Sequence, residues 1–236
     1  MPSPIISATF WQDDTLRTRS VGARVLTGVV DIPAPPARLV ADWTRDISSQ
    51  VPLAPGDVEP MPLARARMRW PEYGQCVQAA ADWTGAIGLP GLLAQSDISL
   101  MACRGARYHH DGEQYSGYVF CNLFLSDDCG LDVHFPYTGQ RIALTRGTML
   151  VFDTCQPHAV IRRDHATFRE ADFGDGMHDV QMFLTWELPV DEARVMRAMG
   201  IRLGETVAGD HEDAGMLVDA RPRTLCPETG RWLPSA

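Results

Sequence analysis

The middle of the chain reads YVFCNLFLSDDCGLDVHFPYTGQRIALTRGTMLVFDTCQPHAVIRR over residues 118–163. Short apolar segments alternate here with turn signals such as Asp-Asp-Cys-Gly and Arg-Gly. The same alternation of apolar segments and turn residues extends over residues 97–188 and predicts seven short strands. We expect them at residues 98–108, 118–125, 131–135, 141–144, 148–152, 158–162 and 180–188. Strands of this length and spacing indicate an antiparallel sandwich or barrel.

Helical signals lie mostly before these strands. Residues 22–32 predict an entering strand, and residues 37–49 place apolar side chains at helical spacing. Residues 51–62 hold four prolines and predict a loop, and residues 73–88 predict a second helix. A short helix over residues 191–200 should begin at an Asp191 cap and end at Gly200. Because helices precede strands, we expect them to pack on one face of a β core.

The composition narrows the function classes. The 236 residues carry a net charge of −9, and every one of the 21 basic residues is arginine. We therefore expect neither nucleic acid nor an anionic membrane surface as a partner, and the absence of lysine excludes lysine chemistry. No apolar run has the length of a membrane span, and no secretory signal is visible at the start. The six cysteines form no C-x-x-C pair, so we expect free thiols and a cytoplasmic location.

One group of residues carries chemistry. His109 and Asp111 share a face if their segment is a strand, and His158 opens a later predicted strand after Pro157. If the two strands pair, two imidazoles and one carboxylate converge as the facial triad of a non-haem Fe(II) site. The alternatives remain open, because Asp111-Gly112 is also a common hairpin turn and a single His158 is often structural.

The stretches YHHDG, YVFCNLFLSDDCGLDVHFP, GQRIALTRGTMLVFDTCQPHAVIRR and VQMFLTWEL resemble the 2-oxoglutarate- and Fe(II)-dependent dioxygenases, in their prolyl-hydroxylase branch. The resemblance covers roughly residues 97–188. It implies a mostly β fold with N-terminal helices, built on the double-stranded β-helix, a cupin-like jelly roll. It also implies Fe(II) on His109, Asp111 and His158, with 2-oxoglutarate as cosubstrate and succinate and CO2 as its products.

With this fold we expect a single domain over residues 1–236. Residues 1–96 would form an N-terminal helical and lid region, residues 97–188 the jelly-roll core, and residues 189–236 a C-terminal extension.

The sequence departs from the family pattern where the family places a carboxylate-binding arginine. The position four residues before Thr185 is Gln181, which is neutral. Arg162 is our first candidate for the anchor, because alternation from His158 directs it inward and a guanidinium binds carboxylates well. Arg169 is the alternative anchor. Asn122 shares a face with Phe120 and Phe124, and we expect it and Gln181 to contact the cosubstrate.

The expected reaction is hydroxylation of an unactivated C–H bond with O2. The expected substrate is a small molecule, either amino acid-like or a natural-product intermediate. A peptidyl-prolyl hydroxylase of the same fold is the first alternative. A halogenase would use the shifted register His110-x-Gly112, and two further alternatives are a cupin-like iron enzyme without a cosubstrate and a metal-free binding module.

Overall fold

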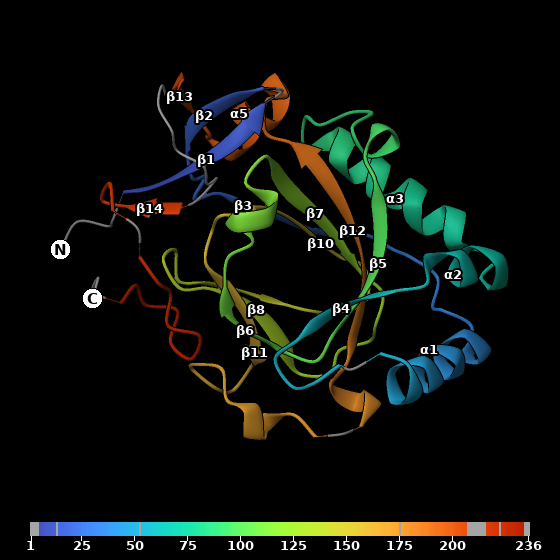
Figure 1. The fold of residues 1–236 in the computed structure, drawn as a ribbon. Helices are drawn as coiled ribbons and strands as arrows, with labels where there is room; N and C mark the ends of the chain where they lie inside the picture. The colour runs from blue at the N-terminus through green and yellow to red at the C-terminus, as the bar shows by residue number, and fades with distance from the viewer. Residues whose placement is uncertain are drawn as a thin grey trace.

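Two antiparallel sheets face each other and form a jelly roll in the computed structural model, which describes residues 5–12, 14–51, 53–174, 176–206, 216–221 and 223–233. The larger sheet has the strand order β3-β10-β7-β12-β5-β4. These strands are β3 (Val25–Val29), β10 (Thr148–Asp153), β7 (Tyr118–Phe124), β12 (Gln181–Pro189), β5 (Ile98–Cys103) and β4 (Val58–Met61). The smaller sheet has the order β6-β11-β8-β9, with β6 (Ala106–His109), β11 (His158–Arg162), β8 (Leu131–Phe135) and β9 (Gln140–Ala143). We call the space between the two sheets the lumen (Figure 1).

Helices cover the outer face of the larger sheet, as expected. They are α1 (Ala37–Ser49), α2 (Leu63–Arg69) and α3 (Tyr73–Ala86) (Figure 1). Helix α1 buries Leu39, Trp43 and Ile47 on one face, in the same cluster as outward side chains of the central strands such as Leu184. Because side chains alternate along a strand, the other face of β7 and β12 is left to line the lumen.

Three local predictions differ from the structure. The expected strand over residues 98–108 divides at Gly105, whose φ of 66° lets the chain turn from β5 into β6 in the other sheet. The proline-rich loop contains the strand β4, which lies at a sheet edge where Pro60 is tolerated. The last predicted helix is α5 (Ala193–Met199), and its cap is Glu192 rather than Asp191.

The two ends of the described chain form a third sheet beside the jelly roll, which the sequence did not predict. It has the order β13-β2-β1-β14, with β13 (Leu203–Thr206), β2 (Thr15–Ser20), β1 (Ile6–Gln12) and β14 (Met216–Val218) (Figure 1). The remaining short elements are α4 (Gly112–Tyr115), η1 (Leu93–Gln95), η2 (Glu170–Asp172) and η3 (Met177–Asp179). None of the helices in the described part of the chain combines the length and the apolar character needed to cross a membrane.

Candidate metal centre

Two imidazoles and one carboxylate meet at one end of the lumen. His109 ends β6 and His158 begins β11, and the two residues are paired in register across the smaller sheet. Asp111 follows at the start of α4, where its backbone N–H donates to the carbonyl of Thr154 at 2.8 Å. Its two carboxylate oxygens lie 3.7 Å from His109 Nε2 and 3.7 Å from His158 Nε2. Because the ligand atoms all lie within 4.8 Å of one another, one ion can contact all three residues.

Backbone carbonyls fix which nitrogen each imidazole presents. His109 Nδ1 lies 2.7 Å from the carbonyl oxygen of Arg107, and His158 Nδ1 lies 2.9 Å from that of Gln156. A carbonyl oxygen only accepts hydrogen bonds, so each Nδ1 carries the proton and each Nε2 keeps its lone pair. Both Nε2 atoms are those that lie beside Asp111. The donor set therefore fits a divalent cation and matches the two-histidine, one-carboxylate pattern of non-haem Fe(II) sites.

Burial supports the neutral form of the histidine ligand at the base of the site. Desolvation, reinforced by the neighbouring His109, holds the pKa of His158 well below its usual value. A neutral imidazole binds a metal without first losing a proton. Desolvation also raises the pKa of Asp111, an effect that a bound cation would reverse.

The neighbouring histidine does not join this group. His110 packs against Trp232, with ring centroids 5.7 Å apart. Asp111, rather than Gly112, lies opposite the two imidazoles. The geometry therefore corresponds to the carboxylate register and not to the shifted register of a halogenase.

A buried ion pair supports the segment that leads to His158. The Arg19 guanidinium contacts both oxygens of Asp153, at 2.6 and 2.8 Å, and both side chains are fully buried. Asp153 also accepts hydrogen bonds from the N–H groups of Gly22 and Cys155. The next residue, Thr154, is the one whose carbonyl accepts from the N–H of Asp111. The ion pair thus fixes the strand end from which the metal-ligand segment departs.

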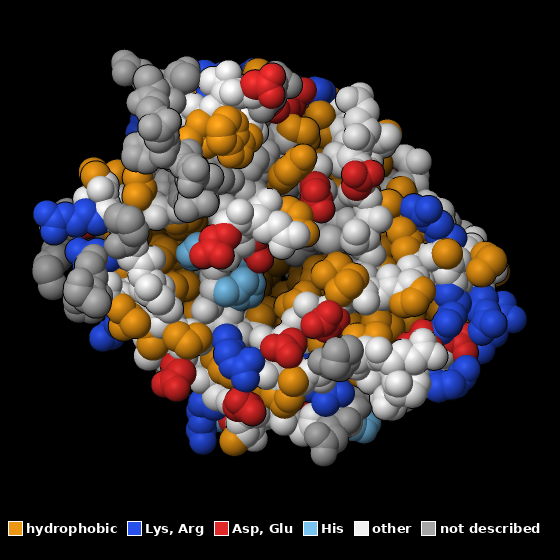
Figure 2. All heavy atoms as spheres, viewed as in Figure 1, with side chains coloured by type: hydrophobic (Ala, Val, Ile, Leu, Met, Phe, Trp, Pro, Cys, Tyr) orange, Lys and Arg blue, Asp and Glu red, His pale blue; other side chains and the backbone are white. Residues whose placement is uncertain are grey.

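The lumen wall is built in rows across paired strands. Nearest the metal centre, Glu187 of β12 pairs with Phe120 of β7, which pairs with Phe152 of β10. Phe152 in turn contacts the ring of His158, with centroids 4.8 Å apart. Figure 2 looks onto this mouth and shows a hollow with histidine and acidic side chains at its rim.

The next row into the lumen is polar. Thr185 pairs with Asn122 on one side and with Ser99 on the other. Asn122 Oδ1 and Thr185 Oγ1 are buried and have no hydrogen-bond partner among the described residues. Buried polar atoms are normally satisfied, so these two are suited to contact a bound molecule. Below them, Phe124 and Phe183 stack with centroids 5.1 Å apart and narrow the lumen.

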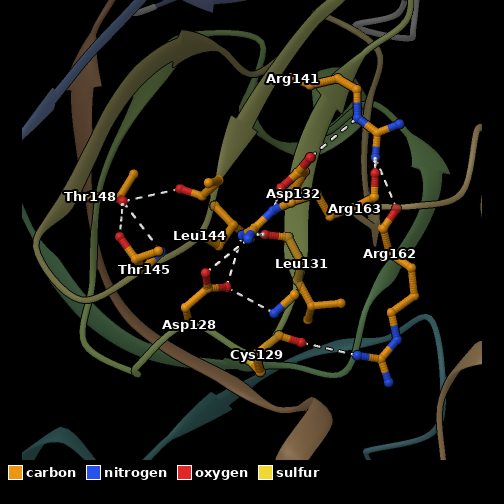
Figure 3. Close-up of polar contacts among 12 residues, drawn as sticks. Asp128, Cys129, Leu131, Asp132, Arg141, Leu144, Thr145, Thr148, Arg162 and Arg163 are labelled. Carbon is orange, nitrogen blue, oxygen red and sulfur yellow. Dashed lines mark hydrogen bonds and ion pairs between the residues drawn. The ribbon is translucent and has the colours of Figure 1, made fainter.

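The proposed anchor Arg162 is already engaged within the protein. Its guanidinium donates to the carbonyls of Cys129 and Asp172, each at 3.0 Å, and pairs with Asp179. Figure 3 shows it reaching Cys129, while the adjacent Arg163 binds Asp128. A carboxylate ligand at Arg162 would therefore have to compete with Asp179.

The other two proposed cosubstrate residues lie apart from the polar row. Gln181 Nε2 donates to the carbonyl of Leu144 at 3.1 Å and to Cys129 Sγ at 2.7 Å, so Gln181 and Arg162 meet at Cys129. Gln181 precedes Thr185 by four residues, which places it about 13 Å further along the strand. The Arg169 side chain is 60% exposed and lies 3.8 Å from Asp172.

Sequence reasoning missed three residues at the mouth and in the row below it. Glu187 and Thr185 lie on the lumen face of β12, and Tyr115 on α4 packs against Phe120 with centroids 5.0 Å apart. The alternation of side chains along the strand could have revealed Glu187. Counting back from Thr185 leads to Gln181, and counting forward by two residues leads to Glu187 on the same face. Tyr115 could not be found in this way, because a helix rather than a strand presents it.

No protein-family model matches the sequence, and no curated protein matches it either. Solved structures do resemble it. A Pseudomonas putida prolyl-4-hydroxylase is 17% identical, covering 70% of this chain and 92% of its own, with a TM-score of 0.41. A viral collagen prolyl hydroxylase from Paramecium bursaria Chlorella virus-1, in its 2OG complex, is 9% identical over 69% and 94%, with a TM-score of 0.42. AviO1 from Streptomyces viridochromogenes is 14% identical over 73% and 91%, with a TM-score of 0.39. These likenesses concern the fold, and the functional argument rests on the site itself.

Proposed function

We propose that this chain is a non-haem Fe(II)- and 2-oxoglutarate-dependent dioxygenase that hydroxylates an unactivated C–H bond. The observation that carries the proposal is the convergence of His109 Nε2, His158 Nε2 and the Asp111 carboxylate at one end of the lumen. Both imidazoles are held by backbone carbonyls in the tautomer that a metal requires.

Iron and 2-oxoglutarate, when bound, would supply the oxidising chemistry: with O2 and a substrate R–H they give R–OH, succinate and CO2. The task of the chain is then to bind, orient and exclude water. Phe152 and Phe120 form an apolar wall beside His158 and limit the access of water to it. The smaller sheet keeps the two histidines on paired strands, which restrains their geometry.

For the cosubstrate we propose Asn122 as a contact, because its buried amide oxygen lacks a partner and faces the lumen. Amide oxygen and nitrogen can exchange by a flip, so Asn122 can either donate or accept. Arg162 remains the proposed anchor of the distal carboxylate, with Gln181 beside it and Arg169 as the alternative. The contacts of Arg162 with Asp179 imply that the anchor must rearrange when a carboxylate binds.

For the substrate we propose a small molecule, with a prolyl residue of a peptide as the alternative. The open mouth in Figure 2 is compatible with either. The six cysteines are free thiols, four of them buried, which supports the proposed reducing, cytoplasmic location.

An anaerobic titration with Fe(II) and 2-oxoglutarate tests the proposal. We expect a weak visible charge-transfer band for the wild type and its loss in Asp111→Ala and His158→Ala. His178→Ala is the matched control, because His178 is exposed on η3 and should leave the band intact. Absence of the band in the wild type would refute the dioxygenase assignment in favour of a binding module, and its persistence without Asp111 would refute the role of that carboxylate as a metal ligand.

A comparison of two arginine variants tests which residue binds the distal carboxylate of 2-oxoglutarate. Arg162→Met should weaken 2-oxoglutarate binding by about 10-fold or more, since a charged hydrogen bond is lost, while Arg169→Met should not. The reverse result would move the anchor to Arg169. Succinate release stimulated by a small amine or by a proline-containing peptide would then distinguish the two substrate classes.

A further inference from the structure

Two carboxylates face each other at the mouth, on the side of the larger sheet. Glu187 lies on the lumen face of β12 and is half-buried, and Asp97 is exposed immediately before β5, the strand paired with β12. Neither carboxylate has an ion-pair partner among the described residues, whereas other acids of this chain, such as Asp127 and Asp128, pair with arginines. A neighbouring like charge disfavours the ionised form of a carboxyl group, and a bound cation would relieve that repulsion.

Aromatic rings border Glu187 on the side away from Asp97. Phe120 is the register partner of Glu187 on β7, and Tyr115 packs on Phe120. Glu187 and Asp111 both contribute to the raised pKa of Tyr115, after burial, so the hydroxyl lies within electrostatic range of both carboxylates. Burial, and then the charge of Asp97, raises the pKa of Glu187 in the same way. Aromatic rings attract organic ammonium ions, so rings beside a carboxylate suit such a ligand.

A second observation points independently to a ligand. Thr185 is two residues from Glu187 on the same face of β12 and is 8% exposed, and its hydroxyl has no partner. Asn122, its register partner, is 6% exposed, and its amide oxygen also has no partner. Thr185 lies directly below Glu187 and Asn122 lies below Phe120, and both residues face the lumen. The wall therefore presents two negative charges at the rim and unfilled acceptors beneath them.

We propose that the rim of this wall is the substrate subsite, and that it binds an ammonium group at Glu187, with Asp97 on one side and the rings of Phe120 and Tyr115 on the other. The substrate class is then a small molecule that carries an amine. This inference rests on the proposed function, because the held ammonium would determine which carbon of the substrate faces His109, Asp111 and His158.

The test measures binding of a simple probe to metal-free protein. Calorimetry with benzylammonium and with benzyl alcohol, its neutral analogue, separates charge recognition from ring burial. We expect benzylammonium to bind about 10-fold or more tightly than the alcohol, as charge-assisted hydrogen bonds imply. Its affinity should fall as salt is raised, whereas that of the alcohol should not.

Variants assign the effect to the two acids. Glu187→Gln should weaken benzylammonium binding by about 10- to 100-fold and leave benzyl alcohol unaffected. Asp97→Asn, at an exposed position that tolerates substitution, should give a smaller loss in the same direction. Asp82→Asn, on the outward side of α3, is the control and should change neither probe.

Equal binding of the two probes, or equal affinity in Glu187→Gln and Asp82→Asn, would overturn the proposal. Because no metal is needed, the result is separable from the iron titration. If the ammonium binds while the charge-transfer band is absent, the dioxygenase assignment fails and the subsite stands. The opposite pair of results leaves the dioxygenase with a different substrate class.

Discussion

Replacing Arg19 by methionine tests how strongly the metal-ligand segment depends on a buried ion pair. The Arg19 side chain is fully buried, donates to both oxygens of Asp153 and also donates to the carbonyl of Ser116 at 2.7 Å. Its loss leaves Asp153 as an uncompensated buried carboxylate, which typically costs about 3–5 kcal/mol. For a chain of this size, that corresponds to a fall in Tm of about 6–20 °C.

The assay is urea and thermal unfolding followed by circular dichroism, with Co(II) affinity measured on the folded variant. Arg19→Met/Asp153→Asn should recover part of the lost stability, because the amide removes the charge yet still accepts from the N–H of Gly22 or Cys155. We also expect Arg19→Met to weaken metal binding by about 10-fold, since Thr154, next to Asp153, holds the N–H of Asp111.

A cost below about 1 kcal/mol would refute this reasoning, because it would mean that Asp153 is not left as an unpaired charge. So would a double variant that is no more stable than Arg19→Met. If stability falls but Co(II) affinity does not, the ion pair supports the fold alone.

The other predictions concern protonation, backbone geometry and the lumen. Burial lowers the pKa values of His110, His134 and His158, so the unfolded chain takes up protons first as the pH falls below about 6.5. The free energy of unfolding of metal-free protein should therefore decline from pH 7.5 to 5.5, by up to about 1.4 kcal/mol per pH unit per histidine, and His158→Gln should flatten the urea-derived profile. Gly147 has a φ of 86°, and an added Cβ would lie 2.0 Å from the carbonyl oxygen of Val30. Gly147→Ala should thus lose about 2 kcal/mol or more in urea unfolding, against about 1 kcal/mol for Gly139→Ala, which has the same backbone strain in open space; equal losses would contradict the clash. Asn122→Leu should leave the free energy of unfolding unchanged or raise it, since the amide oxygen has no partner, while it lowers 2-oxoglutarate affinity in calorimetry; a large loss of stability would show that Asn122 is structural.

Local patterns sufficed where a segment carried its own signal. The helix at residues 37–49 and the strands at 131–135 and 158–162 have the predicted bounds, because helical spacing and turn residues mark them. The strand at 98–108 was predicted as one, since apolar residues continue through Gly105 and only the change of sheet reveals the break. The third sheet depends on pairing between β1 and β14 at opposite ends of the chain. Nothing local signals such contacts.

The residues of the site likewise include some that the sequence could predict and some that it could not. His109, Asp111 and His158 could be found because their types, order and strand positions all pointed to one arrangement. The surroundings of Arg162 could not, because Asp172 and Asp179 reach it from a segment without regular spacing. The alternation of side chains from His158 predicted that Arg162 points inward. Whether its guanidinium is free to bind a ligand depends on Asp172 and Asp179.

The lumen face of β12 shows why charge at a site cannot be inferred from one position. Gln181, Phe183, Thr185 and Glu187 follow one another on this face, so the strand runs from a neutral end, through an aromatic and a hydroxyl, to an acid at the mouth. The family resemblance implies a cation at the first of these positions, and its absence suggested a missing anchor. In the structure Gln181 and a cation from β11 in the opposite sheet, Arg162, both contact Cys129, while the only charge on this face of β12 is negative. The wall is therefore neutral at the position where the resemblance implies a cation and acidic at the mouth, and an acidic mouth is what the proposed ammonium subsite requires.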